Sequence, residues 1–235
     1  RWSGRAKMHA FQSNAEQRPR WERAVTPTQR AAVRFGPLPT VMRLPSHESL
    51  QFGTGDFSIS VLFRLDPRAG EDNHILGKDS FAGGNSYTGF FFQHLRGRLR
   101  FATRDLESGK GPVNYLDSTP MIRKGVWHRA TGVRQSGVLS LFLDEADGPD
   151  VTRREVAPTD VDHPTDFKIG EMDDSPGGAL NGQIAELIVF DRALLAGEVY
   201  ETHQYLRQKY VSPAAVDSLE MALNDFCQAL FCLNE

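Results

Sequence analysis

Cysteine is scarce in this sequence. The only two cysteines among its 235 residues, Cys227 and Cys232, lie near the C-terminus. If this segment is helical, the two side chains point about 140° apart around the axis, which is poor geometry for a mutual disulfide. Two thiols also cannot form a zinc site by themselves. We interpret them as small apolar residues of a helix, and an external disulfide or metal partner remains the alternative.

Long hydrophobic runs and an excess of one charge are also missing. Apolar runs such as 59–63 are far too short to span a bilayer, so we expect no membrane insertion. The chain has 27 Lys and Arg against 30 Asp and Glu, a formal net charge of −3. A nearly balanced surface has no general attraction for nucleic acid or for anionic membranes, and we therefore expect no nucleic-acid partner.

Short alternating segments separated by turn residues are abundant. The clearest is 57–65, where Phe57, Ile59, Val61, Phe63 and Leu65 share one face. Similar segments predict strands at 31–35, 41–44, 74–77, 89–94, 98–103, 126–133, 138–144, 166–169 and 182–191. Arg96-Gly97 and 135–137 are typical of hairpin turns. The pattern predicts an all-β fold, a sandwich of two antiparallel sheets.

Helical periodicity occurs only towards the C-terminus, and it sets the predicted domain limits. We expect an irregular lead-in over 1–30, one β domain over 31–211 that ends in a helix over 193–210, and an amphipathic helix over 212–235. That last helix has an apolar seam with alternating spacings of three and four residues, formed by Val216, Leu219, Leu223, Phe226, Leu230 and Leu233. The seam could pack on the chain's own sandwich or on another chain or domain.

The order of the motifs resembles the laminin-G-like branch of the concanavalin A-like lectin/glucanase superfamily. The resemblance rests on the segments 15–19, 32–35, 50–59, 125–128 and 139–144, on the closing strand Leu180–Leu194, and on Tyr205–Tyr210. It implies a jelly-roll sandwich with one or two C-terminal helices, and an exported protein that resides in the periplasm or outside the cell. The closing strand reads Ile184-Ala185-Glu186 where the family often has Ile-Asp-Glu, which puts a metal contact there in doubt.

The tail, Ala222–Glu235, resembles a different domain. It is similar to the end of a domain found beside cytochrome-c-like domains in large planctomycete proteins. This resemblance implies that the chain is a module of a larger exported protein.

The resemblance to glucanases can be tested on the residues. Retaining glycosidases need two carboxylates about 5 Å apart, which glucanases of this superfamily place on one strand as Glu-x-Asp-x-Glu or Glu-x-Asp-x-x-Glu. The nearest candidate, 171–176, lacks the third carboxylate and contains Pro176. The sequence has no Gly-x-Ser-x-Gly motif, and His128, His163 and His203 lack metal-ligand spacing. We therefore predict that the protein is not an enzyme.

Polar residues of three predicted loops are the candidate site residues. An aromatic ring beside planar polar groups is what sugar recognition requires, and it selects Asp79, Asn85, Tyr87, Arg104 and Asp105 as ligand-binding residues. Calcium prefers carboxylate and carbonyl oxygens, and Asp173 and Asp174 are the candidate ligands. The alternative interpretation is that the polar residues of all three loops bind no ligand and lie in turns exposed to solvent.

Arginines near the first of these loops suggest a further surface. Arg96, Arg98 and Arg100 alternate with Leu95, Leu99 and Phe101, and they could bind an acidic or sulfated glycan. A solvated sheet face is the alternative interpretation.

Two functions remain. The first is a non-catalytic, lectin-like module that binds a glycan or polysaccharide, with calcium as a candidate cofactor. The second is a protein–protein interaction or structural module of a cytochrome-c-associated surface or periplasmic protein, with a protein partner at the C-terminal helix.

Overall fold

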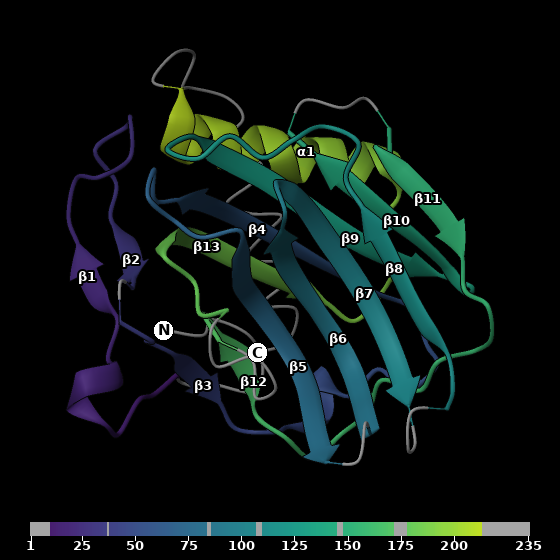
Figure 1. Cartoon of the computed structure of the whole chain (residues 1–235). Coiled ribbons are helices and arrows are strands. Elements are labelled where there is room, and N and C mark those ends of the chain that lie inside the picture. Colours follow the sequence, from purple (N-terminus) through teal and green to yellow (C-terminus); the bar gives the residue numbers. More distant parts are fainter. Residues whose placement is uncertain are drawn as a thin grey trace, which may run out of the picture.

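A computed structural model of this chain describes residues 10–36, 38–83, 86–106, 110–144, 148–171 and 178–212. Within these ranges the paired strands form two antiparallel sheets that pack face to face (Figure 1). The seven-stranded sheet has the order β1 (Arg20–Glu22), β2 (Ala32–Phe35), β13 (Gly182–Phe190), β4 (Phe57–Leu65), β9 (Trp127–Gln135), β10 (Val138–Leu143), β11 (Val151–Arg154). The six-stranded sheet has the order β3 (Met42–Leu44), β12 (Phe167–Ile169), β5 (Asp72–Gly83), β6 (Ser86–Leu95), β7 (Arg98–Leu106), β8 (Val113–Asp117). The predicted jelly-roll sandwich is confirmed.

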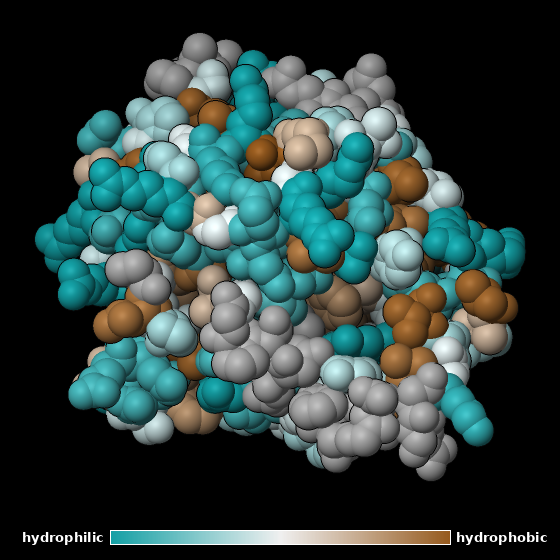
Figure 2. Space-filling view, in the orientation of Figure 1, coloured by the Kyte–Doolittle hydropathy of each residue, from teal (hydrophilic) through white to brown (hydrophobic). Residues whose placement is uncertain are grey.

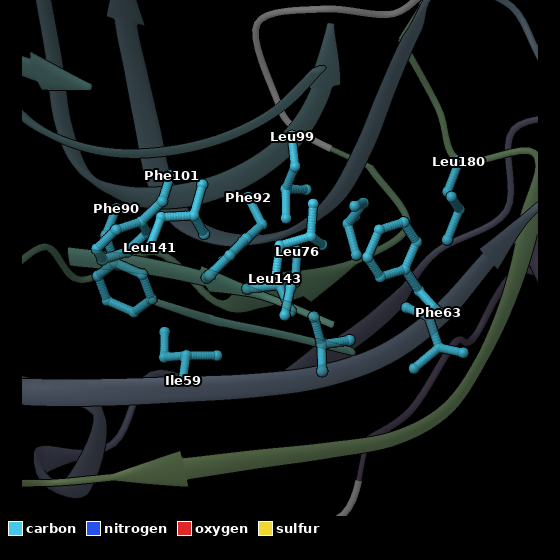
Figure 3. Close-up of a cluster of buried hydrophobic side chains, with 14 of the residues drawn as sticks. Ile59, Phe63, Leu76, Phe90, Phe92, Leu99, Phe101, Leu141, Leu143 and Leu180 are labelled. Atoms are coloured by element: carbon cyan, nitrogen blue, oxygen red, sulfur yellow. The ribbon is translucent and has the colours of Figure 1, made fainter. Parts of the chain in front are cut away.

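The core between the sheets is built from the alternating apolar residues. Ile59 and Phe63 of β4 face Leu76, Phe90 and other side chains of the six-stranded sheet, and all four are fully buried. Figure 3 shows these side chains meeting between the two sheets. The run Phe90-Phe91-Phe92 confirms the two-residue period, since the first and third rings join this core and Phe91 belongs to a separate cluster with Ala102 on the other face.

One helix covers the outer face of the seven-stranded sheet. Helix α1 (Ala196–Leu206) continues into the π-helical turn η3 (Arg207–Val211), and both pack on Trp127 and neighbouring apolar residues of that face. The predicted core position of Trp127 is confirmed. Leu195, at the N-cap, supplies no capping side chain, and Glu198 accepts the Leu195 backbone N–H instead, at 2.8 Å. Among the described residues, no helix is both long and apolar enough to cross a membrane.

Several predicted loops and strand limits differ from the structure. Residues 78–83 and 86–87, expected to belong to one long loop, form part of the hairpin β5–β6, and β8 at 113–117 was not predicted. Strands β1 and β11 were not predicted, and β1 lies in the segment expected to be irregular. The two predicted hairpin turns are confirmed, with positive φ at Arg96, Gly97, Ser136 and Gly137.

Candidate ligand-binding face

The outer face of the six-stranded sheet carries most of the described candidate residues. On β7, Phe101 and Thr103 point into the sandwich, so Arg100, Ala102 and Arg104 point outwards by alternation. This face is turned towards the viewer in Figure 1, with β5 to β8 in front. Figure 2 shows it from the same side, with hydrophilic side chains across its centre and hydrophobic ones beside them.

Asp79 and Arg104 form an ion pair that spans the width of β6. Both residues are register partners of Gly89, which lies between them on β6. Arg104 donates from Nε and Nη2 to the two Asp79 carboxylate oxygens, each at 2.6 Å. Gly89 has φ +135°, and a Cβ there would lie 1.9 Å from the Lys78 carbonyl oxygen. Any side chain at Gly89 would therefore collide with the backbone of β5, so this position between the two charged residues requires glycine.

Two aromatic rings enclose this guanidinium. Its central carbon lies 4.3 Å from the ring centre of Tyr87 and 5.0 Å from that of Phe91. These rings come from positions two residues before and two residues after Gly89, on the same face of β6. Cation–π contact and the bidentate ion pair together hold Arg104 in one orientation. The Asp79 side chain is 1% exposed and that of Arg104 is 12% exposed, so this unit, Asp79–Arg104–Tyr87, is largely enclosed.

A second unit of the same composition lies further along β7, at a more open place. Arg100 donates from Nε and Nη2 to Asp117 at 2.7 and 2.9 Å, and its guanidinium carbon lies 4.3 Å from the ring centre of Tyr115. The hydrogen bond to Asp117 raises the pKa of Arg100 above its usual range. Tyr115 is 42% exposed, and the Asp117 side chain is 33% exposed. This unit, Asp117–Arg100–Tyr115, therefore has polar atoms and a ring within reach of a ligand.

The two units flank a small residue. Ala102 lies between Arg100 and Arg104 on β7, and its register partners are Phe91 and Tyr115. Four residues of strand separate the arginines by about 13 Å. The face thus offers two Arg–Asp pairs, each with a stacked tyrosine, on either side of a short alanine side chain.

The sequence predicted one unit and missed the other. Asp79, Tyr87 and Arg104 were predicted and are brought together, although they lie on strands and not in a loop. Tyr115 and Asp117 were not among the predicted site residues. The signal that could have found them is the alternation of Val113, Tyr115 and Asp117, which is typical of a half-buried strand.

The remaining candidates do not join this face. Asp105 follows Arg104 directly, so its side chain leaves the opposite side of β7, where Thr88 Oγ1 donates to its Oδ1 at 3.4 Å. Its predicted place beside Arg104 is therefore wrong, because neighbours on a strand point in opposite directions. Asn85, Asp173 and Asp174 lie outside the described residues. In the described ranges, no three His, Cys, Asp or Glu side chains are grouped so that they could hold a metal ion.

Comparison with known proteins supports the fold. Residues 40–200 match the family model described as the concanavalin A-like lectin/glucanases superfamily. No curated protein sequence matches the chain.

Solved structures with the same fold include toxin binding domains and a laminin fragment. The binding domain of Paraclostridial Mosquitocidal Protein 1 is similar with a TM-score of 0.62 and 14% identity, over 79% of this chain and 45% of that one. The binding domain of botulinum neurotoxin serotype G gives 0.62 and 10%, over 84% and 46%. Domains LG4-5 of the mouse laminin α1 chain give 0.53 and 18%, over 71% and 43%. The aligned part is thus less than half of each of those three chains.

Proposed function

This chain belongs to the concanavalin A-like lectin/glucanases superfamily, and from that premise we propose that it is a non-catalytic module that binds a carbohydrate on the outer face of its six-stranded sheet. The observation that carries the proposal is the Asp117–Arg100–Tyr115 unit, an accessible ion pair beside an exposed ring. We further propose that the module is part of a larger exported protein and acts in the periplasm or outside the cell.

The chemistry of the two units favours a sugar without charge. Arg100 and Arg104 each pair with an aspartate, so each unit is neutral as a whole. A carboxylate accepts hydrogen bonds from sugar hydroxyls, a guanidinium donates to their oxygens, and a tyrosine ring can pack on the apolar face of a sugar. A sulfated or acidic glycan would instead need cations that are not already neutralised. The predicted acidic-glycan surface of Arg96, Arg98 and Arg100 is the less favoured form of the proposal, because Arg100 is already paired with Asp117 and Arg98 donates to the backbone carbonyls of Ser118 and Thr119.

The stacked arrangement also lowers the cost of binding. Arg100 is held by two hydrogen bonds to Asp117 and by the ring of Tyr115, so its side chain loses little further freedom when a ligand binds. Preorganised polar groups give affinity mainly by avoiding this ordering cost. Arg104 is held in the same way by Asp79 and Tyr87, but it is more enclosed and therefore less accessible to a ligand than Arg100.

Replacing Tyr115 with alanine is expected to weaken binding of a neutral polysaccharide by about threefold to tenfold, which corresponds to the loss of roughly 0.5–1.5 kcal/mol of ring stacking. Affinity electrophoresis over a panel of neutral, acidic and sulfated polysaccharides would identify the ligand, and titration calorimetry with a soluble oligosaccharide would measure the change. Tyr200→Ala is the matched control, because Tyr200 is 46% exposed on helix α1, which packs on the other sheet.

The proposal has clear contrary results. If no polysaccharide of the panel binds at millimolar sugar, this face is not a carbohydrate site, and a protein ligand becomes the alternative. If a sugar binds but Tyr115→Ala and Tyr200→Ala bind it equally well, the sugar binds elsewhere on the module.

A further inference from the structure

A third arginine stacks on an aromatic ring, on the outer face of the seven-stranded sheet. Its neighbours Phe63 and Leu65 belong to the core, so Arg64 points outwards from β4 by alternation. Its guanidinium carbon lies 5.1 Å from the ring centre of Trp127, the register partner of Arg64 on β9. Arg64 Nε donates to Gln183 Oε1 at 2.7 Å. The ring and this hydrogen bond hold the guanidinium in one orientation, as in the two units of the other sheet.

Arg64 differs from Arg100 and Arg104 because it has no carboxylate partner. In the part of the chain that the structure describes, no carboxylate forms an ion pair with Arg64, and neither of its Nη atoms has a hydrogen-bond partner. Both Nη atoms reach solvent, since they are not buried. For the other two arginines, Asp117 and Asp79 supply a carboxylate that accepts two hydrogen bonds. At Arg64 such a carboxylate would have to come from a ligand.

The ring beside this guanidinium also has a donor without an acceptor. Trp127 is 8% exposed, and its indole Nε1 is buried with no hydrogen-bond partner. Buried donors in proteins nearly always have a partner, and each exception calls for an explanation such as a bound ion. The stack of Arg64 on Trp127 thus contains two donor groups that lack an acceptor, which is the pattern expected beside an anionic ligand.

The charges around Arg64 favour a ligand with one anionic group. Arg34 of β2 lies in the same row across the sheet, through Gln183, and is paired with Asp66 at 2.6 Å. Burial and the nearby charge of Arg34 lower the pKa of Arg64, and an anion bound at Arg64 would offset both effects. Glu22 and Asp66 are close enough to raise the same pKa. These two carboxylates would repel a ligand with many negative charges, such as a sulfated glycan or an acidic peptide.

A sugar acid fits these surroundings. Its carboxylate can accept from Nη1 and Nη2 of Arg64, and its hydroxyl groups can donate to the carboxylates of Glu22 and Asp66. We propose that Arg64, held by the ring of Trp127, forms a second ligand site that binds the carboxylate of a uronic acid in an acidic polysaccharide. This site is separate from the proposed neutral-sugar face, because the two lie on the outer faces of different sheets.

Titration calorimetry with trigalacturonate and with its methyl ester tests the proposal in the full chain. The ester has the same sugar rings without the charge, so we expect it to bind at least tenfold more weakly than the acid. Arg64→Met should weaken binding of the acid at least tenfold. Arg64→Lys should weaken it less, since an ammonium keeps the charge but not the bidentate geometry. Arg154→Met is the matched control and should bind the acid as the native chain does, because Arg154 is exposed on β11, at an edge of the same sheet.

Further measurements separate this site from the neutral-sugar face and from effects on folding. Tyr115→Ala should bind the acid as the native chain does, and Arg64→Met should keep its affinity for the neutral polysaccharide. Urea denaturation shows whether each Arg64 variant is folded. If Arg64→Met does not fold, Arg64→Lys and the comparison of acid with ester on the native chain decide the outcome.

The proposal is wrong if the acid does not bind at millimolar concentration, if the ester binds equally well, or if a folded Arg64→Met binds the acid as tightly as the native chain. Heparin or poly-glutamate that binds through Arg64 more tightly than the acid would show a sulfated or peptide ligand, and would also overturn it. A failure of neutral polysaccharides to bind would concern only the face of Tyr115.

Discussion

Replacing Arg134 with methionine is expected to lower the free energy of unfolding by about 3–5 kcal/mol, the range for breaking a buried ionic network. Arg134 lies on β9 and is fully buried. It donates from Nε to the Gly55 carbonyl at 2.7 Å, from Nη1 to Thr159 at 2.8 Å and from Nη2 to Gly53 at 2.6 Å. The Arg134 side chain thus connects the loop of Gly53 and Gly55 with the loop of Thr159, which lies about a hundred residues later in the sequence.

The loss follows from what the guanidinium leaves behind. Glu155 Oε1 lies 3.8 Å from Arg134 Nη1, and the Glu155 side chain is only 4% exposed. Without Arg134 this carboxylate has lost its buried cation, and the three carbonyls have lost a donor each. The Phe57 ring, 5.1 Å from the guanidinium carbon, also loses a cation–π contact.

Urea denaturation at neutral pH measures this effect. Arg154→Met is the matched control, because Arg154 is exposed on β11 and its side chain donates to the Ser136 carbonyl at a distance of 3.5 Å. The control should change stability by less than about 0.5 kcal/mol. The loss of stability for Arg134→Lys should lie between the losses for Arg134→Met and Arg154→Met. A lysine ammonium keeps the charge, but it cannot donate to three carbonyls as the forked guanidinium does. A loss below about 1 kcal/mol for Arg134→Met would contradict this account of the two loops.

Acidification from pH 6.5 to pH 4 should remove about 3 kcal/mol of stability through His203 alone. His203 is a buried residue of helix α1, where its Nδ1 donates to the Asp144 carbonyl at 2.8 Å and its Nε2 accepts from Thr131 Oγ1 at 2.9 Å. Thr131 Oγ1 in turn accepts from Ser60 Oγ at 2.7 Å. Both ring nitrogens are satisfied in the neutral form. Burial is the main cause that lowers the pKa of His203 to about 4, and the charge of Arg129 adds to it.

The direction of the pH effect follows from proton binding. The folded pKa is depressed, so between about pH 4 and pH 6.5 the unfolded chain binds a proton that the folded chain does not. Stability therefore falls as the pH is lowered through this window. His94 and His163 act in the same direction, because burial lowers the pKa of each. The pKa of Asp144 is also lowered, but an aspartate contributes only at more acidic pH.

Urea denaturation at several pH values between 7 and 4 tests this prediction. His203→Gln keeps a donor and an acceptor without a titrating ring, and it should reduce the fall in stability over this range by about 3 kcal/mol. Gln204→Ala, at the next position of α1, should leave the fall as in the native chain. If His203→Gln and the native chain lose stability in parallel, His203 is not the group that titrates.

The central strand β4 was predicted well, and the edge strands β1 and β11 were not. The segment 57–65 was assigned with both ends correct, because every second residue from Phe57 to Leu65 is apolar and packs into the core between the sheets. Strands β1 and β11 are short and mostly exposed, so no hydrophobic pattern marks them. Their extended form comes from backbone pairing with β2 and β10, which is a tertiary effect.

The candidate residues were recognised by type but misplaced in structure. Lys78 and Asp79 look like loop residues, yet both are buried on β5. Lys78 donates to the His163 carbonyl, and burial lowers its pKa to about 8. Asp79 is neutralised by Arg104. These partners lie 85 and 25 residues away, so composition alone could not distinguish a polar strand from a loop.

The pairing of β2 with β13 fixes when the sandwich can be completed. Val33 is the register partner of Ile184, so β2 cannot pair with β13 until that late strand has been synthesised. On the ribosome, β5 to β8 can form their hairpins while β13 is still unsynthesised. Synthesis proceeds at about 5–20 residues per second. The apolar face of this partial sheet is therefore exposed for several seconds before β13 is available. Chaperone contact during synthesis should therefore concentrate on the interval before residue 190 emerges.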